Sequence, residues 1–264
     1  MKPSRVLLDQ RCSLLRSLHV PGAPLVLPNA WDAASARAVV AAGFPVVATT
    51  SGGVAATLGY ADGEAAPPDE MFAAATRVSR AVDVPVTVDS EAGYGLAPDV
   101  LVGRLLDAGA AGCNLEDSDH GAGGLVDPER QAEWLAAVRQ AALERAYGLV
   151  VNARIDVFIG QERQNAPALL DDAITRARAY IGAGVDCVFP ILLHDVGVLT
   201  AFLDAVQFPV NILAVPPGPS NAALAAMGVA RISYGSSIYR QTMADLAARL
   251  ERIMQTVDQD AMAP

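Results

Sequence analysis

The stretch VPVTVDSEAGYG, residues 84–95, decides the fold prediction. It begins as a short apolar run and ends in two acids, Asp89 and Glu91, followed by Gly93 and Gly95. An apolar run without alternating polar residues is typical of a strand that is buried on both faces of a parallel sheet. We therefore predict a buried parallel strand that delivers two carboxylates into a glycine-rich loop.

The same pattern recurs along the chain. Apolar runs of this kind lie at 24–29, 45–50, 111–117, 148–156, 186–191, 209–214 and 230–235. Alanine-rich segments with helical spacing lie between them, at 32–42, 69–82, 97–108, 128–145, 166–182, 195–206 and 219–227. Several of these segments end in a glycine, which supplies the left-handed cap of a tight helix-to-strand turn. The alternation predicts an α/β fold, a (β/α)8 TIM barrel, with a doubly wound open sheet as the alternative.

Both ends of the chain predict additional helices. Residues 4–18 are amphipathic, and residues 237–256 carry an apolar seam that alternates by four and three positions. The members of this seam are Tyr239, Met243, Leu246, Leu250 and Ile253. The seam packs either on the barrel's own helical ring or against another subunit. We predict one barrel domain over residues 1–264, with an N-terminal helix and a long C-terminal helix.

Composition excludes several classes of partner. The net charge is −10, which disfavours nucleic acid because a phosphate-backbone binder needs a basic face. The apolar runs are too short to span a bilayer, so we expect no membrane partner. The three cysteines are far apart and form no CxxC motif, which favours a reducing compartment. We therefore expect a cytoplasmic protein.

Polar residues gather where the predicted strands end, and these ends meet at one mouth of a barrel. They are Thr49, Thr50, Ser51, Gly52, Gly53, Asp89, Glu91, Asn114, Glu116, Asp117, Asn152, Arg154, Asp156, Asn211, Ser233 and Ser236. Acids on adjacent strand ends need a cation to stay charged in a partly dry site. Oxygen ligands without a His or Cys cluster favour Mg²⁺, or Mn²⁺, over zinc.

The other strand ends suit a small anion. Arg154 offers a planar fork for a substrate carboxylate, and residues 51–53 offer backbone N–H groups for a second oxyanion. A metal together with such donors could stabilise an enolate. Structural roles compete with each assignment: Asp89 could cap or bridge a loop, Glu116 could pair with Arg154, and residues 51–52 could simply turn. His120 and His194 are expected to be solvated, and Asp32 to cap a helix.

Four motifs together resemble the isocitrate lyase/phosphoenolpyruvate mutase superfamily over residues 24–235. They are Asp89-Ser90-Glu91-Ala92-Gly93-Tyr94-Gly95, Ser51-Gly52-Gly53 with Leu58-Gly59-Tyr60-Ala61-Asp62, Leu115-Glu116-Asp117, and Ala153-Arg154-Ile155-Asp156. The resemblance implies a Mg²⁺-dependent barrel that makes or breaks C–C or P–C bonds in small 2-oxo acids. It also implies a homo-oligomer, a dimer or a tetramer, often with the C-terminal helix packed on a neighbour.

The resemblance also implies roles for single residues. Asp89 would bind the metal directly, while Asp62, Glu91 and Glu116 would hold metal-bound waters. Ser51 and Gly52 would bind the substrate carboxylate with help from Arg154. Gly53 and Asn211 complete the predicted substrate-binding set.

The chain departs from the superfamily pattern in two places. Glu91 stands where aspartate is usual. The loop at 116–131 lacks the Lys-Lys/Arg-Cys-Gly-His motif of isocitrate and methylisocitrate lyases, whose cysteine is the acid/base. The resemblance is therefore to a short-loop branch, similar to oxaloacetate decarboxylase and carboxyphosphonoenolpyruvate mutase, and isocitrate lyase activity is not expected.

The resulting prediction is a Mg²⁺-dependent carbon–carbon lyase or decarboxylase. Its substrate would be a small 2-oxo or 2-hydroxy dicarboxylic acid, cleaved through a metal-stabilised enolate with release of pyruvate or a similar product. The predicted catalytic residues are Arg154, Glu116 and Tyr60, whose hydroxyl, or a water, would protonate the enolate. The alternatives are a P–C bond mutase or hydrolase of the same superfamily and a non-catalytic binder of 2-oxo acids.

Overall fold

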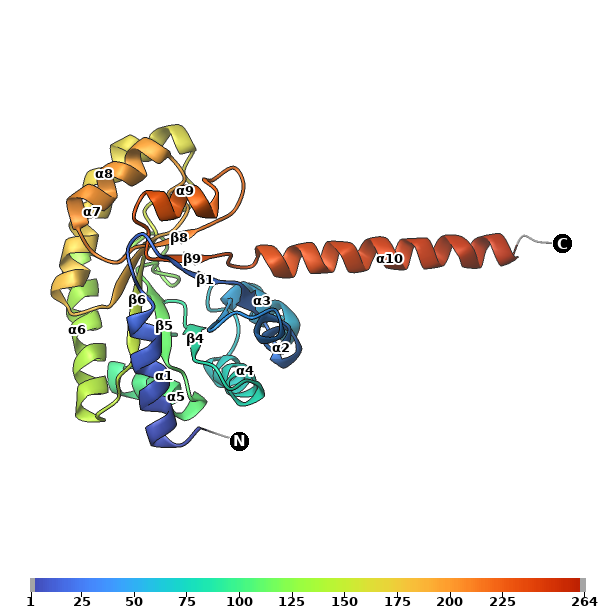
Figure 1. The fold of residues 1–264 in the computed structure, drawn as a ribbon, viewed down its shortest axis with the longest axis horizontal. Helices are drawn as coiled ribbons and strands as arrows, with labels where there is room; N and C mark the ends of the chain where they lie inside the picture. The colour runs from blue at the N-terminus through green and yellow to red at the C-terminus, as the bar shows by residue number, and fades with distance from the viewer. Residues whose placement is uncertain (1–2, 262–264) are drawn as a thin grey trace.

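The computed structural model describes residues 3–261, and its centre is a closed barrel of parallel strands (Figure 1). The strands are β1 (Leu25–Leu27), β2 (Asn29–Ala30), β3 (Val47–Thr49), β4 (Val86–Asp89), β5 (Gly112–Glu116), β6 (Val150–Ile155), β7 (Cys187–Pro190), β8 (Asn211–Leu213) and β9 (Arg231–Ser233). Strands β2 to β7 pair in order, and β1, β9 and β8 form the remaining arc. A parallel bridge between Val188 and Val210 joins the two arcs on one side. On the other side β1 and β2 continue one another across Pro28, which has no N–H to donate to a ladder.

Helices α2 to α9 surround this barrel, as the sequence predicts, whereas α1 and α10 lie at the two ends of the chain (Figure 1). The helices are α1 (Arg5–Ser17), α2 (Ala33–Ala41), α3 (Ser51–Leu58), α4 (Pro68–Ala81), α5 (Pro98–Ala108), α6 (Pro128–Glu144), α7 (Ala166–Gly182), α8 (Val196–Val206), α9 (Asn221–Ala226) and α10 (Ser237–Ala261), with a short 3-10 turn, η1 (Arg163–Asn165), before α7. Gly43, Gly109, Gly184 and Gly228 follow helices with φ between 75° and 93°, the left-handed conformation expected of such caps. The predicted TIM-barrel fold is confirmed.

Helix α1 closes the N-terminal end of the barrel. A Cβ on Gly112, at the start of β5, would lie 2.7 Å from the Leu15 side chain, and one on Gly148 would lie 3.4 Å from Cβ of Cys12. Leu15 and Cys12 are both fully buried. Because α1 fills this end, the opposite end, where the strands terminate, is the one left open for a site.

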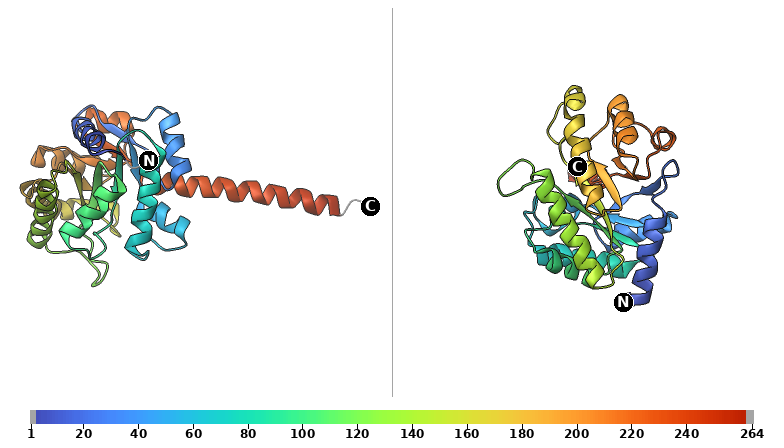
Figure 2. Two further views of the ribbon diagram at one scale, coloured as in Figure 1. Left: turned by 90° about the horizontal axis from the view of Figure 1, so that it is seen from below. Right: turned by 90° about the vertical axis from the view of Figure 1, so that its left-hand side faces the viewer.

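Two segments differ from their prediction. Residues 51–53, expected as a loop, form the first turn of α3. Helix α10 reaches Ala261 rather than residue 256, and it projects away from the barrel (Figures 1 and 2). Its side chains Met243, Leu246, Leu250 and Ile253 are 42–57% exposed, so packing of this seam on the barrel's own ring is wrong. Within residues 3–261, no helix combines the length and apolar character that crossing a membrane requires.

Candidate active site

A cavity of about 220 Å³ lies where the carboxyl ends of the strands meet. Its lining includes Ser51, Asp62, Asp89, Asn114, Arg154 and Arg240. Apolar side chains, among them Phe189 and Leu213, form part of its wall. The structure therefore brings Asp89 and Arg154, which the strand ends predict, together with Asp62 and the first turn of α3.

Asp89 connects two adjacent strand ends. Its Oδ2 accepts the Ser51 N–H at 3.0 Å, and its own N–H donates to Thr49 Oγ1 at 2.8 Å. Its Oδ1 is buried and has no hydrogen-bond partner among the described residues. A buried carboxylate oxygen without a partner is costly, and a bound cation would offset that cost.

The donor set fits Mg²⁺ held by one carboxylate. Within the part of the chain that the structure describes, no three His, Cys, Asp or Glu side chains converge to hold a metal by themselves. Magnesium commonly binds through one or two carboxylates and completes its shell with waters and substrate oxygens. The geometry therefore suits Asp89 as the direct ligand, and the roles of Asp62, Glu91 and Glu116 toward bound water stay predictions.

Gly52 allows the chain to approach the cavity closely. A Cβ at this position would lie 2.7 Å from Asp62 Oδ2 and 2.8 Å from Ser236 Oγ. Both distances are shorter than real Cβ contacts, so any other residue would displace a neighbouring side chain. A Cβ on Gly53 would instead meet the side chains of Thr50, at 2.7 Å, and Trp31, at 3.1 Å, and Gly53 is not among the residues that line the cavity.

Glu91 lies under the neighbouring loop rather than in the cavity lining. It is 2% exposed, its φ is 47°, and its Oε2 accepts the Glu64 N–H. The Glu64 carboxylate in turn accepts the Tyr94 N–H. Desolvation raises the pKa of Glu91 to about 7. Glu91 and Tyr94 both have a left-handed backbone conformation, and these two hydrogen bonds to Glu64 stabilise it by joining their loop to the loop that follows α3.

Glu116 links a histidine to the site arginine. Its Oε1 lies 2.6 Å from His120 Nε2, and its Oε2 pairs with Arg154. This hydrogen bond to Glu116 is the largest cause of a raised pKa for His120. The expected ion pair between Glu116 and Arg154 is present, whereas His120, which we predicted to be solvated, is in contact with a buried carboxylate.

Arg154 is held rigidly on one side and open on the other. Its Nε and Nη2 donate to the two Asp156 oxygens at 2.6 and 2.7 Å. Burial alone would lower the pKa of Arg154, but Asp156 and Glu116 raise it, so the guanidinium stays charged. No acceptor among the described residues receives a hydrogen bond from Arg154 Nη1, which leaves this group for a ligand carboxylate.

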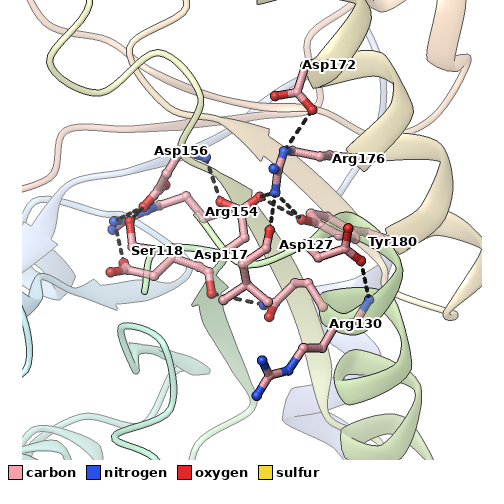
Figure 3. A network of polar contacts seen from close by, with 12 residues as sticks. Asp117, Ser118, Asp127, Arg130, Arg154, Asp156, Asp172, Arg176 and Tyr180 are labelled. Carbon is pink, nitrogen blue, oxygen red and sulfur yellow. Dashed lines mark hydrogen bonds and ion pairs between the residues drawn. The ribbon is translucent and has the colours of Figure 1, made fainter. Parts of the chain in front are cut away.

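A buried network supports this arginine from behind (Figure 3). Asp117 Oδ1 accepts the Asp156 N–H at 2.9 Å, and its Oδ2 accepts from Tyr180 Oη at 2.6 Å and Arg176 Nη1 at 2.9 Å. Arg176 also donates to the Val126 carbonyl at 2.8 Å. Helix α7 is therefore tied to the ends of β5 and β6 and to the loop that follows β5.

Tyr60 and Asn211, both predicted site residues, also lie outside the cavity lining. The Tyr60 hydroxyl donates to Glu70 at 3.0 Å at the surface, so it is not positioned to protonate a ligand. Asn211 is fully buried, and its amide donates to Ser233 Oγ at 3.2 Å beneath the cavity. Arg240, in the first turn of α10, also lines the cavity. It was not predicted from the sequence, because only residues at the strand ends were considered and Arg240 lies in the helix that follows the last strand.

Comparison with known proteins identifies the family. The family model of phosphoenolpyruvate phosphomutase matches residues 15–254. A solved structure from Burkholderia cenocepacia J2315, provisionally described as a phosphonomutase, shares 43% identity and a TM-score of 0.87 over 92% of this chain and 100% of that one. Oxaloacetate decarboxylase of Rhodopseudomonas palustris (strain BisB5) is 34% identical over 78% of this chain and 71% of its own length. 2-Methylisocitrate lyase of Escherichia coli (strain K12) is 30% identical over 74% of this chain and 70% of its own length.

These relatives are lyases and mutases, and the match spans almost the whole barrel. The chain belongs to the phosphoenolpyruvate phosphomutase family, within the isocitrate lyase/phosphoenolpyruvate mutase superfamily that its strand-end motifs predict.

Proposed function

We propose that this protein is a Mg²⁺-dependent carbon–carbon lyase that acts on a small 2-oxo or 2-hydroxy dicarboxylic acid. Decarboxylation or C–C cleavage would pass through an enolate and release pyruvate or a similar product. The observation that carries the proposal is the cavity itself, where the unpartnered Asp89 Oδ1 and the free Nη1 side of Arg154 share a volume of about 220 Å³. That volume suits a small diacid.

The chain's own groups divide the work. Arg154 binds one substrate carboxylate, and the N-terminus of α3 at Ser51 and Gly52 favours negative charge nearby. Glu116 and Asp156 fix the orientation of Arg154, and the apolar wall limits water in the cavity. When bound, Mg²⁺ would supply Lewis-acid stabilisation of the developing oxyanion. Water is the proposed proton donor, because Tyr60 faces Glu70.

A substrate panel tests this proposal. Oxaloacetate, substituted malates and phosphonopyruvate are incubated with the protein and Mg²⁺ or Mn²⁺, and pyruvate release is measured above the rate with free metal. We expect release from a 2-oxo or 2-hydroxy diacid. Turnover of phosphonopyruvate alone would favour the P–C bond alternative. Binding of oxalate only with Mg²⁺, without turnover of any compound, would favour a non-catalytic 2-oxo acid binder.

Two variants locate the activity. Asp89→Ala should abolish the rate above free metal, because it removes the proposed direct ligand. Asp99→Ala, an exposed acid in the first turn of α5, is the matched control and should leave the rate unchanged. Equal rates in the two variants would place the metal elsewhere.

We also propose that the protein is a homo-oligomer in which α10 packs on a second copy. Its apolar seam is exposed along the helix, and a mostly apolar hollow of about 490 Å³ lies between α2 and the start of α10. An apolar helical face of this length is rarely left in water.

A further inference from the structure

Asn114 presents an amide to the floor of the cavity. It lies on β5 directly beside Asp89 of β4 in the parallel register, and it is one of the lining residues. The side chain is 7% exposed. Its amide is therefore close to the carboxylate proposed to hold the metal, at the same height in the barrel.

The orientation of this amide is fixed by two donors beneath it. Arg231 Nη2 donates to Asn114 Oδ1 at 3.0 Å, and Asn152 Nδ2 donates to the same oxygen at 2.9 Å. A guanidinium has no acceptor, so the atom that Arg231 contacts must be the oxygen of the amide. The NH₂ group consequently lies on the other side of the side chain.

Nothing in the described chain accepts a hydrogen bond from that NH₂ group. Asn114 Nδ2 is also absent from the buried polar atoms that lack a partner, so it retains access to the cavity. A donor held in this way, next to a metal-binding carboxylate, meets an oxygen of any small anion that enters.

Arg231 is an unusual side chain to place in a barrel core. It is 1% exposed, its Nε and Nη1 have no hydrogen-bond partner, and no carboxylate of the described residues pairs with it. Burying an unpaired guanidinium is costly in stability. The contact with Asn114 is the one side-chain hydrogen bond in the described chain that its guanidinium makes, and it points toward the cavity floor.

We propose that Asn114 donates a hydrogen bond to an oxygen of the bound 2-oxo acid anion, and that Arg231 is a positioning residue that acts through Asn114. The inference rests on the proposed function, since it names a further contact of the same site. This contact would contribute to substrate specificity. The Asn114 NH₂ group would favour ligands that place an acceptor oxygen over the cavity floor, because an apolar substituent there would leave the amide without a hydrogen-bond partner.

Titration with oxalate tests the proposal, because oxalate is a planar dianion of the expected kind and binding requires no turnover. The affinity is measured calorimetrically with saturating Mg²⁺, after the Mg²⁺ affinity has been measured alone. Asn114→Ala should weaken oxalate binding roughly 10- to 100-fold, the effect of losing one charge-assisted hydrogen bond. It should leave the affinity for Mg²⁺ alone unchanged.

A double-mutant cycle tests the role of Arg231. Arg231→Met should weaken oxalate binding roughly 3- to 30-fold in the wild-type background and less than about twofold when Asn114 is already alanine. Arg231→Lys, which keeps a donor, should restore most of the affinity and also serves if the methionine variant does not fold. Arg11→Met is the matched control. Arg11 is also a buried arginine, but it donates to the carbonyl of Val82, which follows α4 and precedes β4 at the N-terminal end of the barrel. This control variant should change stability but not affinity.

The outcomes separate the two proposals. If wild type does not bind oxalate with Mg²⁺, the proposed function is wrong and this inference is wrong with it. If wild type binds but Asn114→Ala binds equally well, or loses Mg²⁺ affinity by the same factor, only the ligand contact is overturned. Equal losses from Arg231→Met in both backgrounds would show that Arg231 does not act through Asn114.

Discussion

His19 is predicted to make the protein less stable in mild acid. It follows α1 and is 8% exposed, and its Nδ1 contacts the Leu15 carbonyl at 2.8 Å. Because a carbonyl only accepts, Nδ1 carries the proton and Nε2 is a bare acceptor, buried without a partner. Protonating Nε2 would bury an unpaired charge near Arg231. Burial, with the charge of Arg231, accordingly lowers the pKa of His19 from 6.5 to about 4.

The size and sign follow from linkage. Above pH 6.5 the histidine is neutral in both the folded and the unfolded chain, so its environment costs nothing. Between pH 6.5 and 4 the unfolded chain takes up the proton and the folded chain does not. The free energy of unfolding therefore decreases as the pH is lowered. One pKa unit corresponds to about 1.4 kcal/mol, which gives a total loss of roughly 3 kcal/mol from this group.

Urea unfolding of wild type and His19→Gln, from pH 8 to pH 4.5, measures the effect. Other groups titrate in both proteins, so the difference between the two curves isolates His19. At pH 8 the variant shows only its structural cost, and as the pH falls wild type should lose its stability more steeply. Curves that remain parallel over the whole range would refute the argument.

Three further outcomes are expected. Tyr180→Phe removes a hydrogen bond to the Asp117 carboxylate and should lower the free energy of unfolding in urea by roughly 1.5–3 kcal/mol. Tyr147→Phe, which removes a hydrogen bond to the uncharged Ala110 carbonyl, should lower it by only roughly 0.5–1.5 kcal/mol. Equal losses in the two variants would contradict the charge-assisted hydrogen bond of Tyr180. Gly52→Ala should weaken oxalate binding on the order of tenfold or more, because its Cβ displaces cavity side chains, and unchanged affinity would count against this close approach. Leu250→Glu places a charge in the exposed apolar seam of α10 and should lower the molar mass measured by light scattering. A wild-type protein that is monomeric in this measurement would contradict the oligomer proposal.

The strand positions were predictable because burial on two faces dictates their composition. Val86 and Val88 are buried in β4, and the apolar residues of β5, β6 and β7 are buried in the same way. The acids at the strand ends were predictable for the same reason, since a charged residue directly after such a run has to lie at the mouth. These signals are local in sequence, and the barrel only assembles them.

Side-chain partners were not predictable, because they depend on contacts between distant segments. Tyr60 contacts Glu70 and His120 contacts Glu116 through loop conformations that no local pattern encodes. Gly52 and Gly53 are poor helix formers, which concealed the first turn of α3. The spacing in α10 indicated an apolar seam but contained no information on whether the helix would fold back or leave the barrel.

The departure of α10 has a consequence for solution behaviour. Arg240, near the start of this helix, lines the cavity, while the remainder extends outward (Figure 1). A second copy docked on the helix would also hold Arg240 in place. Ligand binding in the cavity and association of two copies would then be thermodynamically coupled. Ligand should therefore promote association, and the specific activity should fall when the protein is diluted.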